Sequence, residues 1–220
     1  MVSNKRIDRA LNGPGFIEVT LGALLGVALG VGVASLYLVL KPVAVLIKPP
    51  EVVTTSEVSF VQGAFNSSKA RQWTRKHQLL AEGRSTDLLF CEEELNAWMA
   101  SAVAKTPSES TKLVIPEQVN FRITGGIIQI GVLGKWQALE LSQPLVIQAR
   151  GKFVPGAAGF VFTADEFYIG SLPLHAVPGL PQWVIQRVLA AQNLPAELTA
   201  MWAKLKLVAV EDNALHIVVP

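Results

Sequence analysis

Side chains that carry acid–base or metal chemistry are few in this sequence and stand far apart. The three histidines, His77, His175 and His216, fall in three different predicted elements. The sequence contains no G-x-S-x-G, no phosphate-binding glycine loop, no H-E-x-x-H and no dinucleotide fingerprint. Because no acid, base and nucleophile set is visible, we expect a non-enzymatic protein without catalytic residues, bound metal or other cofactor.

Three adjacent glutamates, Glu92, Glu93 and Glu94, open a predicted helix over residues 92–105. Neighbouring helix residues point in different directions, and carboxylates in a first turn are favoured by the helix dipole. Cys91, the one cysteine, stands at the expected N-cap, where Ser, Thr or Asp is usual. A reactive thiol at a helix N-terminus is one interpretation. A small buried hydrophobic side chain is the favoured one.

A local cluster of cations lies in a second predicted helix, over residues 64–82. One interpretation is contact with an anionic surface, worth about 1 kcal/mol per cation near lipid headgroups. The other, which we favour, is a solvated helix face. The residues of this basic cluster are Lys69, Arg71, Arg75 and Lys76, followed by His77.

Bulk apolarity in the β region is the feature that points to binding. Residues 127–133 are apolar on both faces of a predicted strand, and residues 160–162 repeat the pattern. Two-sided apolarity in an antiparallel strand means that both faces are covered or that one lines an internal groove. A dry core explains it at least as well as a lipid groove. The candidate lining residues of such a groove are Ile128, Ile130, Val132, Phe160 and Phe162.

The pattern of helix-like and strand-like segments that contain these residues predicts an α+β fold with one curved antiparallel sheet. Gly125 and Gly126 separate two strand-like runs and predict a tight hairpin turn. The sheet is expected to pack on helices at 92–105 and 182–204, the second of them resuming at Pro195. The predicted strands are 86–90, 119–124, 127–133, 144–154, 160–169, 206–211 and 214–219.

Residues 19–40 contain no charged side chain. At about 1.5 Å per residue they extend roughly 33 Å, enough to cross a hydrocarbon core of about 30 Å. The run exceeds the 7–15 residues typical of a signal peptide, so we favour an uncleaved transmembrane helix over 16–40. The remaining segments are an N-terminal flank at 1–15, a juxtamembrane connection at 41–63 and a domain at 64–220.

The charged residues on either side of this helix predict its orientation across the membrane. Lys5, Arg6 and Arg9 precede it, and Lys41 and Lys48 follow it. By the positive-inside rule, we expect a cytoplasmic N-terminus and an extracytoplasmic C-terminal domain at the inner membrane. Beyond residue 40, 16 Lys or Arg face 15 Asp or Glu, so no nucleic-acid footprint is present.

Within the predicted membrane helix, Gly22, Gly26 and Gly30 recur at every fourth position. Small residues at this spacing form a flat stripe that permits close packing of two helices. The stripe therefore predicts a membrane-protein partner or a second copy of the chain. Glycine is frequent in membrane helices, which is the alternative explanation.

The order of elements resembles a known family. The carrying features are the hydrophobic anchor, a polar helix, a strand ending in Phe90, E-E-E-L-N-A-W from Glu92 to Trp98, long strands, and I-G-S-L-P-L from Ile169 to Leu174. Over residues 60–220 the chain resembles the YpmS-like single-pass extracytoplasmic bacterial proteins. More distantly, it is similar to tubular lipid-binding (TULIP-like) domains, whose curved sheet wraps a helix around an apolar groove.

The resemblance implies binding of a lipid or another apolar ligand outside the cytoplasm, without catalytic residues. Together with the two-sided apolar strands, it makes a membrane-anchored lipid-binding protein the preferred prediction. The alternative is a structural or accessory subunit of a membrane or envelope complex, docked through the glycine stripe and the domain.

Overall fold

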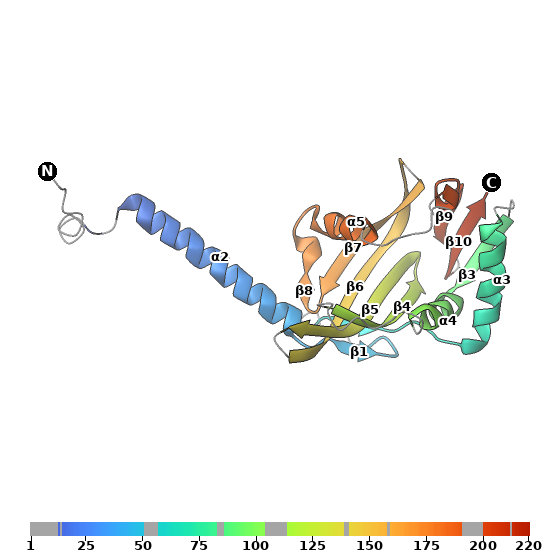
Figure 1. Cartoon of the computed structure of the whole chain (residues 1–220), viewed down its shortest axis with the longest axis horizontal. Coiled ribbons are helices and arrows are strands. Elements are labelled where there is room, and N and C mark those ends of the chain that lie inside the picture. Colours follow the sequence, from blue (N-terminus) through green and yellow to red (C-terminus); the bar gives the residue numbers. More distant parts are fainter. Residues whose placement is uncertain are drawn as a thin grey trace. The chain divides into compact units, whose positions relative to one another are not determined.

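In the computed structural model, the described residues are 13, 15–50, 57–82, 86–103, 114–138, 141–157, 159–190, 200–211 and 213–220. The chain divides into two compact units, Met1–Val39 and Leu40–Pro220. The described residues of the first unit include helix α2, and the second is an α+β unit with antiparallel sheets (Figure 1). The predicted α+β class and the N-terminal apolar helix are therefore confirmed.

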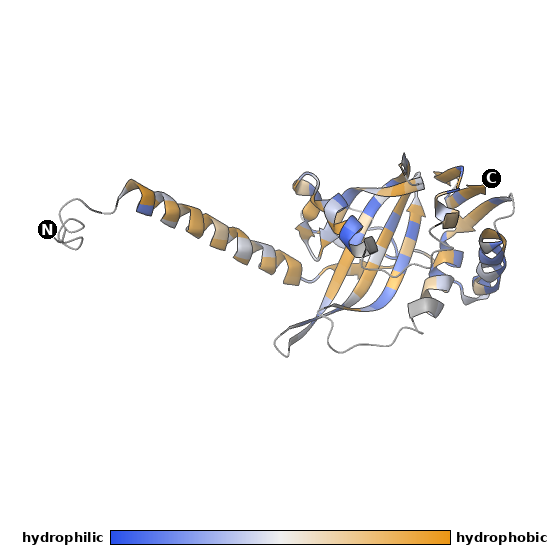
Figure 2. Cartoon of the chain, turned by 45° about the horizontal axis from the view of Figure 1, so that its top comes forward, coloured by the Kyte–Doolittle hydropathy of each residue, from blue (hydrophilic) through white to orange (hydrophobic). Residues whose placement is uncertain are grey.

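Helix α2, Phe16–Leu40, covers the apolar run. It ends shortly before Pro42, as expected because the residue before a proline is disfavoured in the α conformation. Figure 2 shows hydrophobic residues along its whole length. Among the described residues, α2 is the one helix long and apolar enough to cross a membrane, although a signal sequence meets the same criteria.

The long strands form one antiparallel meander in which each strand pairs with the next in sequence. Between the first two, Gly125 and Gly126 have φ of +61° and +76°, so both central turn residues are left-handed, as in a type I′ hairpin. The predicted hairpin is confirmed. The five strands are β4 Val114–Thr124, β5 Ile127–Ala138, β6 Leu141–Gly156, β7 Gly159–Ile169 and β8 Leu172–Pro173.

The expectation of a single sheet is wrong, because three further strands form a sheet of their own. Strand β10, Ala214–Val219, lies between β3, Thr86–Cys91, and β9, Leu207–Glu211. Its apolar face packs on one end of the meander, so both sheets contribute to one core. Residues of that core include Leu88, Phe90, Leu95, Ile123, Ile128, Val208, Leu215, Ile217 and Val219.

Two helices of the unit lie beside the three-stranded sheet, and a third follows the meander (Figure 1). They are α3 Ala70–Ala81, α4 Glu92–Val103 and α5 Leu180–Ala190, with short 3-10 turns η1 Ser67–Lys69 and η2 Leu174–Ala176. The first helix begins later than predicted because the Asn66 side chain accepts from the Ser68 N–H and opens η1 instead. Residues 191–199, which include the start of the helix predicted from Pro195, lie outside the described residues.

The connection at 41–63 contains two short strands, β1 Ala44–Leu46 and β2 Ser59–Val61, which pair in parallel. Residues 59–63, here named the crossing segment, run across three strands of the meander. The Ser59 carbonyl accepts from Gln148 at 3.3 Å, and the Val61 carbonyl from Gln129 at 3.1 Å. Further along the chain, the Gly63 N–H donates to Asn120 Oδ1 at 2.7 Å. These three side-chain amides stand on β6, β5 and β4, so the chain advances one strand every two residues.

Phe60 fixes the crossing segment to the sheet. Its side chain is 0% exposed and lies over Gly131 on β5. A Cβ atom at Gly131 would stand 2.2 Å from two carbons of the Phe60 ring, so only glycine leaves room for it. The crossing segment is therefore part of the folded unit rather than an extended linker.

Candidate functional site

The five-stranded sheet has two chemically different faces, because neighbouring residues of a strand point to opposite sides. On β5, Ile128, Ile130 and Val132 share one face, and Gln129 and Gly131 share the other. We refer to them as the apolar face and the polar face. Figure 2 shows the alternation of hydrophobic and hydrophilic residues along the strands.

Most of the predicted groove residues pack in the core. Ile128 is 1% exposed and lies inside the core cluster, so it does not line an open surface. Ile130, Phe160 and Phe162 are half-buried and pack against the same cluster. Within that packing, the Trp202 indole N–H donates to the Phe160 carbonyl at 2.7 Å. The core at this end of the sheet covers the apolar face of β5, whereas Phe60 covers Gly131 on the opposite face.

The apolar face continues beyond the core. Val132 pairs with Val119 on β4 and Ile147 on β6, and Ile147 pairs with Ile169 on β7. These four residues form one row across four strands, here named the apolar row. Each is half-buried, and none belongs to the core cluster or to the hydrophobic residues packed against it. Of the five predicted lining residues, Val132 is the one in this row.

The basic cluster is smaller than predicted. Lys76 Nζ donates to both carboxylate oxygens of Glu94 at 2.7 Å, and that side chain is 1% exposed. Lys76 therefore neutralises a buried carboxylate and does not face an anionic surface. Arg71 and Arg75 stay exposed one turn apart on α3, and Lys69 is half-buried at its start. Their contact with an anionic surface stays a prediction.

The E-E-E-L-N-A-W stretch covers the open edge of the meander. Strand β4 is an edge strand, whose outward N–H and C=O groups need partners. Asn96 of α4 accepts from the Phe121 N–H at 2.6 Å and donates to its carbonyl at 2.8 Å. Glu92 accepts from the Ile123 N–H at 2.8 Å and from the Ala64 N–H. These polar side chains replace a neighbouring strand, which is a structural role.

Glu94 also closes the start of α4. Its Oε2 accepts from the Cys91 N–H at 3.0 Å, which places the two residues at the N-cap and N3 positions of a capping box. Burial raises the pKa of the Cys91 thiol above its usual value, so the thiol is held in its neutral form. Cys91 is half-buried, so the predicted buried side chain is only partly enclosed.

The three histidines lie in different parts of the unit. His77 is next to the Trp73 ring, with centroids 5.7 Å apart, and His175 is next to Tyr168 at 4.9 Å. In the described part of the chain, no three His, Cys, Asp or Glu side chains are arranged to hold a metal ion.

His216, on the outer face of the three-stranded sheet, lies between two carboxylates. Its Nδ1 is 3.0 Å from Glu211 Oε2, and its Nε2 contacts Asp87 Oδ1. A carboxylate only accepts hydrogen bonds, so both contacts are hydrogen bonds when both ring nitrogens carry hydrogen. The hydrogen bond with Glu211, followed by that with Asp87, raises the pKa of His216 above its usual 6.5.

This arrangement predicts a stability that depends on pH. A raised folded-state pKa stabilises the protein fully below pH 6.5, and this stabilisation is lost as the pH rises through the folded-state value. Urea unfolding between about pH 6 and 9 should therefore show a decrease in unfolding free energy that His216→Gln removes. An identical pH slope in the two proteins would contradict the assignment.

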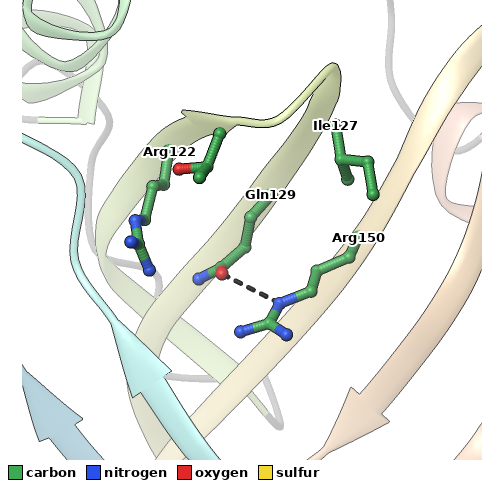
Figure 3. Close-up of a pocket in the computed structure, with 5 residues that line it drawn as sticks. Arg122, Ile127, Gln129 and Arg150 are labelled. Carbon is green, nitrogen blue, oxygen red and sulfur yellow. Dashed lines mark hydrogen bonds between the residues drawn. The ribbon is translucent and has the colours of Figure 1, made fainter. Parts of the chain in front are cut away.

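A pocket that sequence reasoning missed opens on the polar face, near the β4–β5 turn. It has a volume of about 220 Å³ and is lined by Arg122, Thr124, Ile127, Gln129 and Arg150. Figure 3 shows the two arginine side chains on either side of Gln129, one from β4 and one from β6. Two guanidinium groups, one amide and one hydroxyl group thus surround a single hollow.

Comparison with known proteins found no matching protein family, no matching curated protein and no matching solved structure. The resemblance to YpmS-like and TULIP-like proteins therefore stays a prediction. Helix packing through the glycine stripe also stays a prediction. On α2, a Cβ atom at Gly22, Gly26 or Gly30 would meet no atom within 4 Å, so no contact at the stripe tests it.

Proposed function

We propose that this chain is a membrane-anchored, non-enzymatic protein whose domain binds a lipid acyl chain along the apolar face of the meander. Helix α2 is the anchor, in the inner membrane, with the N-terminus in the cytoplasm and the domain outside. The observation that carries the proposal is the apolar row Val119–Val132–Ile147–Ile169. It lies on the same face of the sheet as the core, but its four residues are not part of the core cluster.

The apolar row has the chemistry that an acyl chain requires. Its four side chains are branched hydrocarbons in cross-strand register, so they form a continuous surface without a polar atom. Burying such surface gains about 25 cal/mol per Å². The positions remain half-buried within the domain, so area is still available for a ligand to cover. Attachment to an apolar helix keeps a lipid supply close to the chain.

Photo-crosslinking of the full chain in phosphatidylcholine nanodiscs tests the proposal. The probe is a phosphatidylcholine with a diazirine at the end of one acyl chain, and adducts are located by peptide mass spectrometry. We expect adducts on strands β4 to β7 at the apolar row, in addition to those on α2. Adducts confined to residues 16–40 would contradict the proposal, because the row would then be covered by protein alone.

Two substitutions on one strand provide a matched control. Val132→Lys places an ammonium group on the apolar face and should abolish the adducts on the domain. Leu133→Lys adds the same charge next to it on the opposite face, and it should leave them in place. Circular dichroism verifies that each variant is folded, and Ile147→Lys repeats the test from a second strand.

The second candidate function is an accessory subunit that docks through α2. Its support is the small-residue stripe on a helix with no buried residue. A helix of this kind can accept a partner helix at close distance. This role differs from the first in its requirement for a protein partner.

A further inference from the structure

A row of polar and charged residues crosses the meander on its polar face. By register, Arg122 on β4 pairs with Gln129 on β5, which pairs with Arg150 on β6, and Arg150 pairs with Glu166 on β7. Two guanidinium groups thus stand on either side of one neutral amide, with a single carboxylate at the end. The row lies on the opposite face from the apolar row, so it is independent of the proposed acyl-chain site.

Arg150 is held in a fixed orientation by a buried side chain. Its Nε donates to Gln129 Oε1 at 3.0 Å, and Gln129 is 5% exposed. The same amide donates from Nε2 to the Val61 carbonyl of the crossing segment, which fixes its own orientation. An arginine held in this way has little conformational freedom left for a ligand to restrict, so the entropic cost of binding is lower.

The carboxylate beside Arg150 contacts only one of its N–H groups. Arg150 Nη1 is 3.4 Å from Glu166 Oε2, and the two side chains are 38% and 45% exposed. An exposed pair at this distance contributes little, because water screens both charges. A guanidinium has five N–H donors, so at least three of those on Arg150 are unused by these contacts.

Arg122 has no partner within the described part of the chain, where it makes neither a hydrogen bond nor an ion pair. It is nevertheless half-buried and lines the pocket of about 220 Å³ together with Arg150. Thr124 adds a hydroxyl group, and Ile127 an apolar wall. Figure 3 shows both guanidinium groups at the same end of the Gln129 side chain.

We propose that this pocket is a binding site for a phosphate group. A guanidinium donates two parallel hydrogen bonds to a pair of acceptor oxygens, and that geometry suits phosphate. Two arginines that approach from β4 and β6 need a ligand with acceptor oxygens on more than one side. The tetrahedral phosphate has them, whereas a planar carboxylate presents one pair. The phosphate is that of a lipid headgroup or of a small soluble phosphate compound.

The test uses the full chain in phosphatidylcholine nanodiscs, with inorganic phosphate as the probe. Thermal unfolding is followed by tryptophan fluorescence, and phosphate is titrated against potassium chloride at equal ionic strength. A ligand that binds only the folded state raises the Tm. We expect such a rise, and we expect Arg122→Gln to weaken the apparent affinity roughly 10-fold or more, as for loss of charged hydrogen bonds.

Arg122→Gln is the decisive variant. The Arg122 side chain makes no hydrogen bond or ion pair in the described part of the chain, so the substitution removes no contact that stabilises the fold. Arg187→Gln, at an exposed position of α5 outside the pocket, removes the same charge elsewhere and should bind phosphate as the parent chain does. Arg150→Gln should behave like Arg122→Gln, with circular dichroism as the check of folding.

Nanodiscs with about one third phosphatidylglycerol separate the two sources of phosphate. If this lipid raises the Tm through Arg122 and removes the response to added phosphate, the occupant is a lipid headgroup. If the response persists unchanged, the occupant is a soluble phosphate compound, and both results support the site. The proposal is overturned if neither phosphate nor phosphatidylglycerol has an effect on Tm that Arg122→Gln reduces.

Discussion

Phe60→Ala should lower the free energy of unfolding of the domain by about 4 kcal/mol, as expected when a fully buried aromatic ring is removed. The ring is 0% exposed and fills the space above Gly131. Its loss also loosens the crossing segment, so the hydrogen bonds from Gln129 and Gln148 are weakened. Urea unfolding of the full chain in detergent measures the effect.

Tryptophan fluorescence is a selective probe for this experiment, since residues 1–40 contain no tryptophan and the signal comes from the domain alone. Phe65→Ala is the control, because this nearby ring is 58% exposed and its removal should change the free energy by less than about 0.5 kcal/mol. A loss below about 1 kcal/mol for Phe60→Ala would show that residues 59–63 are not firmly docked on the sheet.

Glu94→Ala should have the second large effect, a loss of about 3 kcal/mol. The substitution leaves Lys76 without its carboxylate partner and removes the capping bond to the Cys91 N–H. Breaking a buried ion pair costs about 3–5 kcal/mol. The lower end applies here, because the Lys76 side chain is 30% exposed and can turn toward water.

Glu93→Ala provides the matched control for this prediction. It removes a carboxylate from the same first turn but leaves the capping bond and the ion pair, so about 0.5 kcal/mol is expected. Lys76→Met completes a double-mutant cycle with Glu94→Ala. A coupling energy well above 0.5 kcal/mol is expected for residues in direct contact. A coupling near zero would contradict the ion pair.

The sequence was sufficient to predict local features of the fold. Apolar length predicted α2, and Gly125–Gly126 predicted the hairpin, because both signals depend on residues that are close in the chain. The pairing of β3 with β10 joins residues 86–91 to residues 214–219. No periodicity specifies such a distant pairing, which is why one sheet was expected where two pack together.

Buried polar residues were the second limit of the sequence prediction. The sequence interpretation explained Glu92 and Glu94 by the helix dipole alone and made no prediction for Asn96, yet Glu94 and Asn96 are 1% and 2% exposed. Their partners are Lys76 and the edge of β4, which lie in other elements. A polar residue in an amphipathic pattern is assumed to face water, and only tertiary structure shows a buried partner.

The residues of the candidate sites also differ in how far the sequence could predict them. Ile128 was predicted as a ligand contact and is core, because periodicity reports burial without saying what covers a residue. The pairing of Arg122 with Gln129 follows from the turn at Gly125–Gly126, since the two residues are equally distant from it. Arg150 joins them only through the register of β5 with β6, for which the sequence has no comparable turn signal.

The crossing segment has a mechanical consequence. Tension on the chain from the side of α2 enters the domain first through β1 and then through β2, with which it pairs. From there the load divides among three side-chain amides, and each of these belongs to a different strand of the meander. Tension that reaches residues 59–63 is therefore passed to three strands of the meander and not to its edge strand alone.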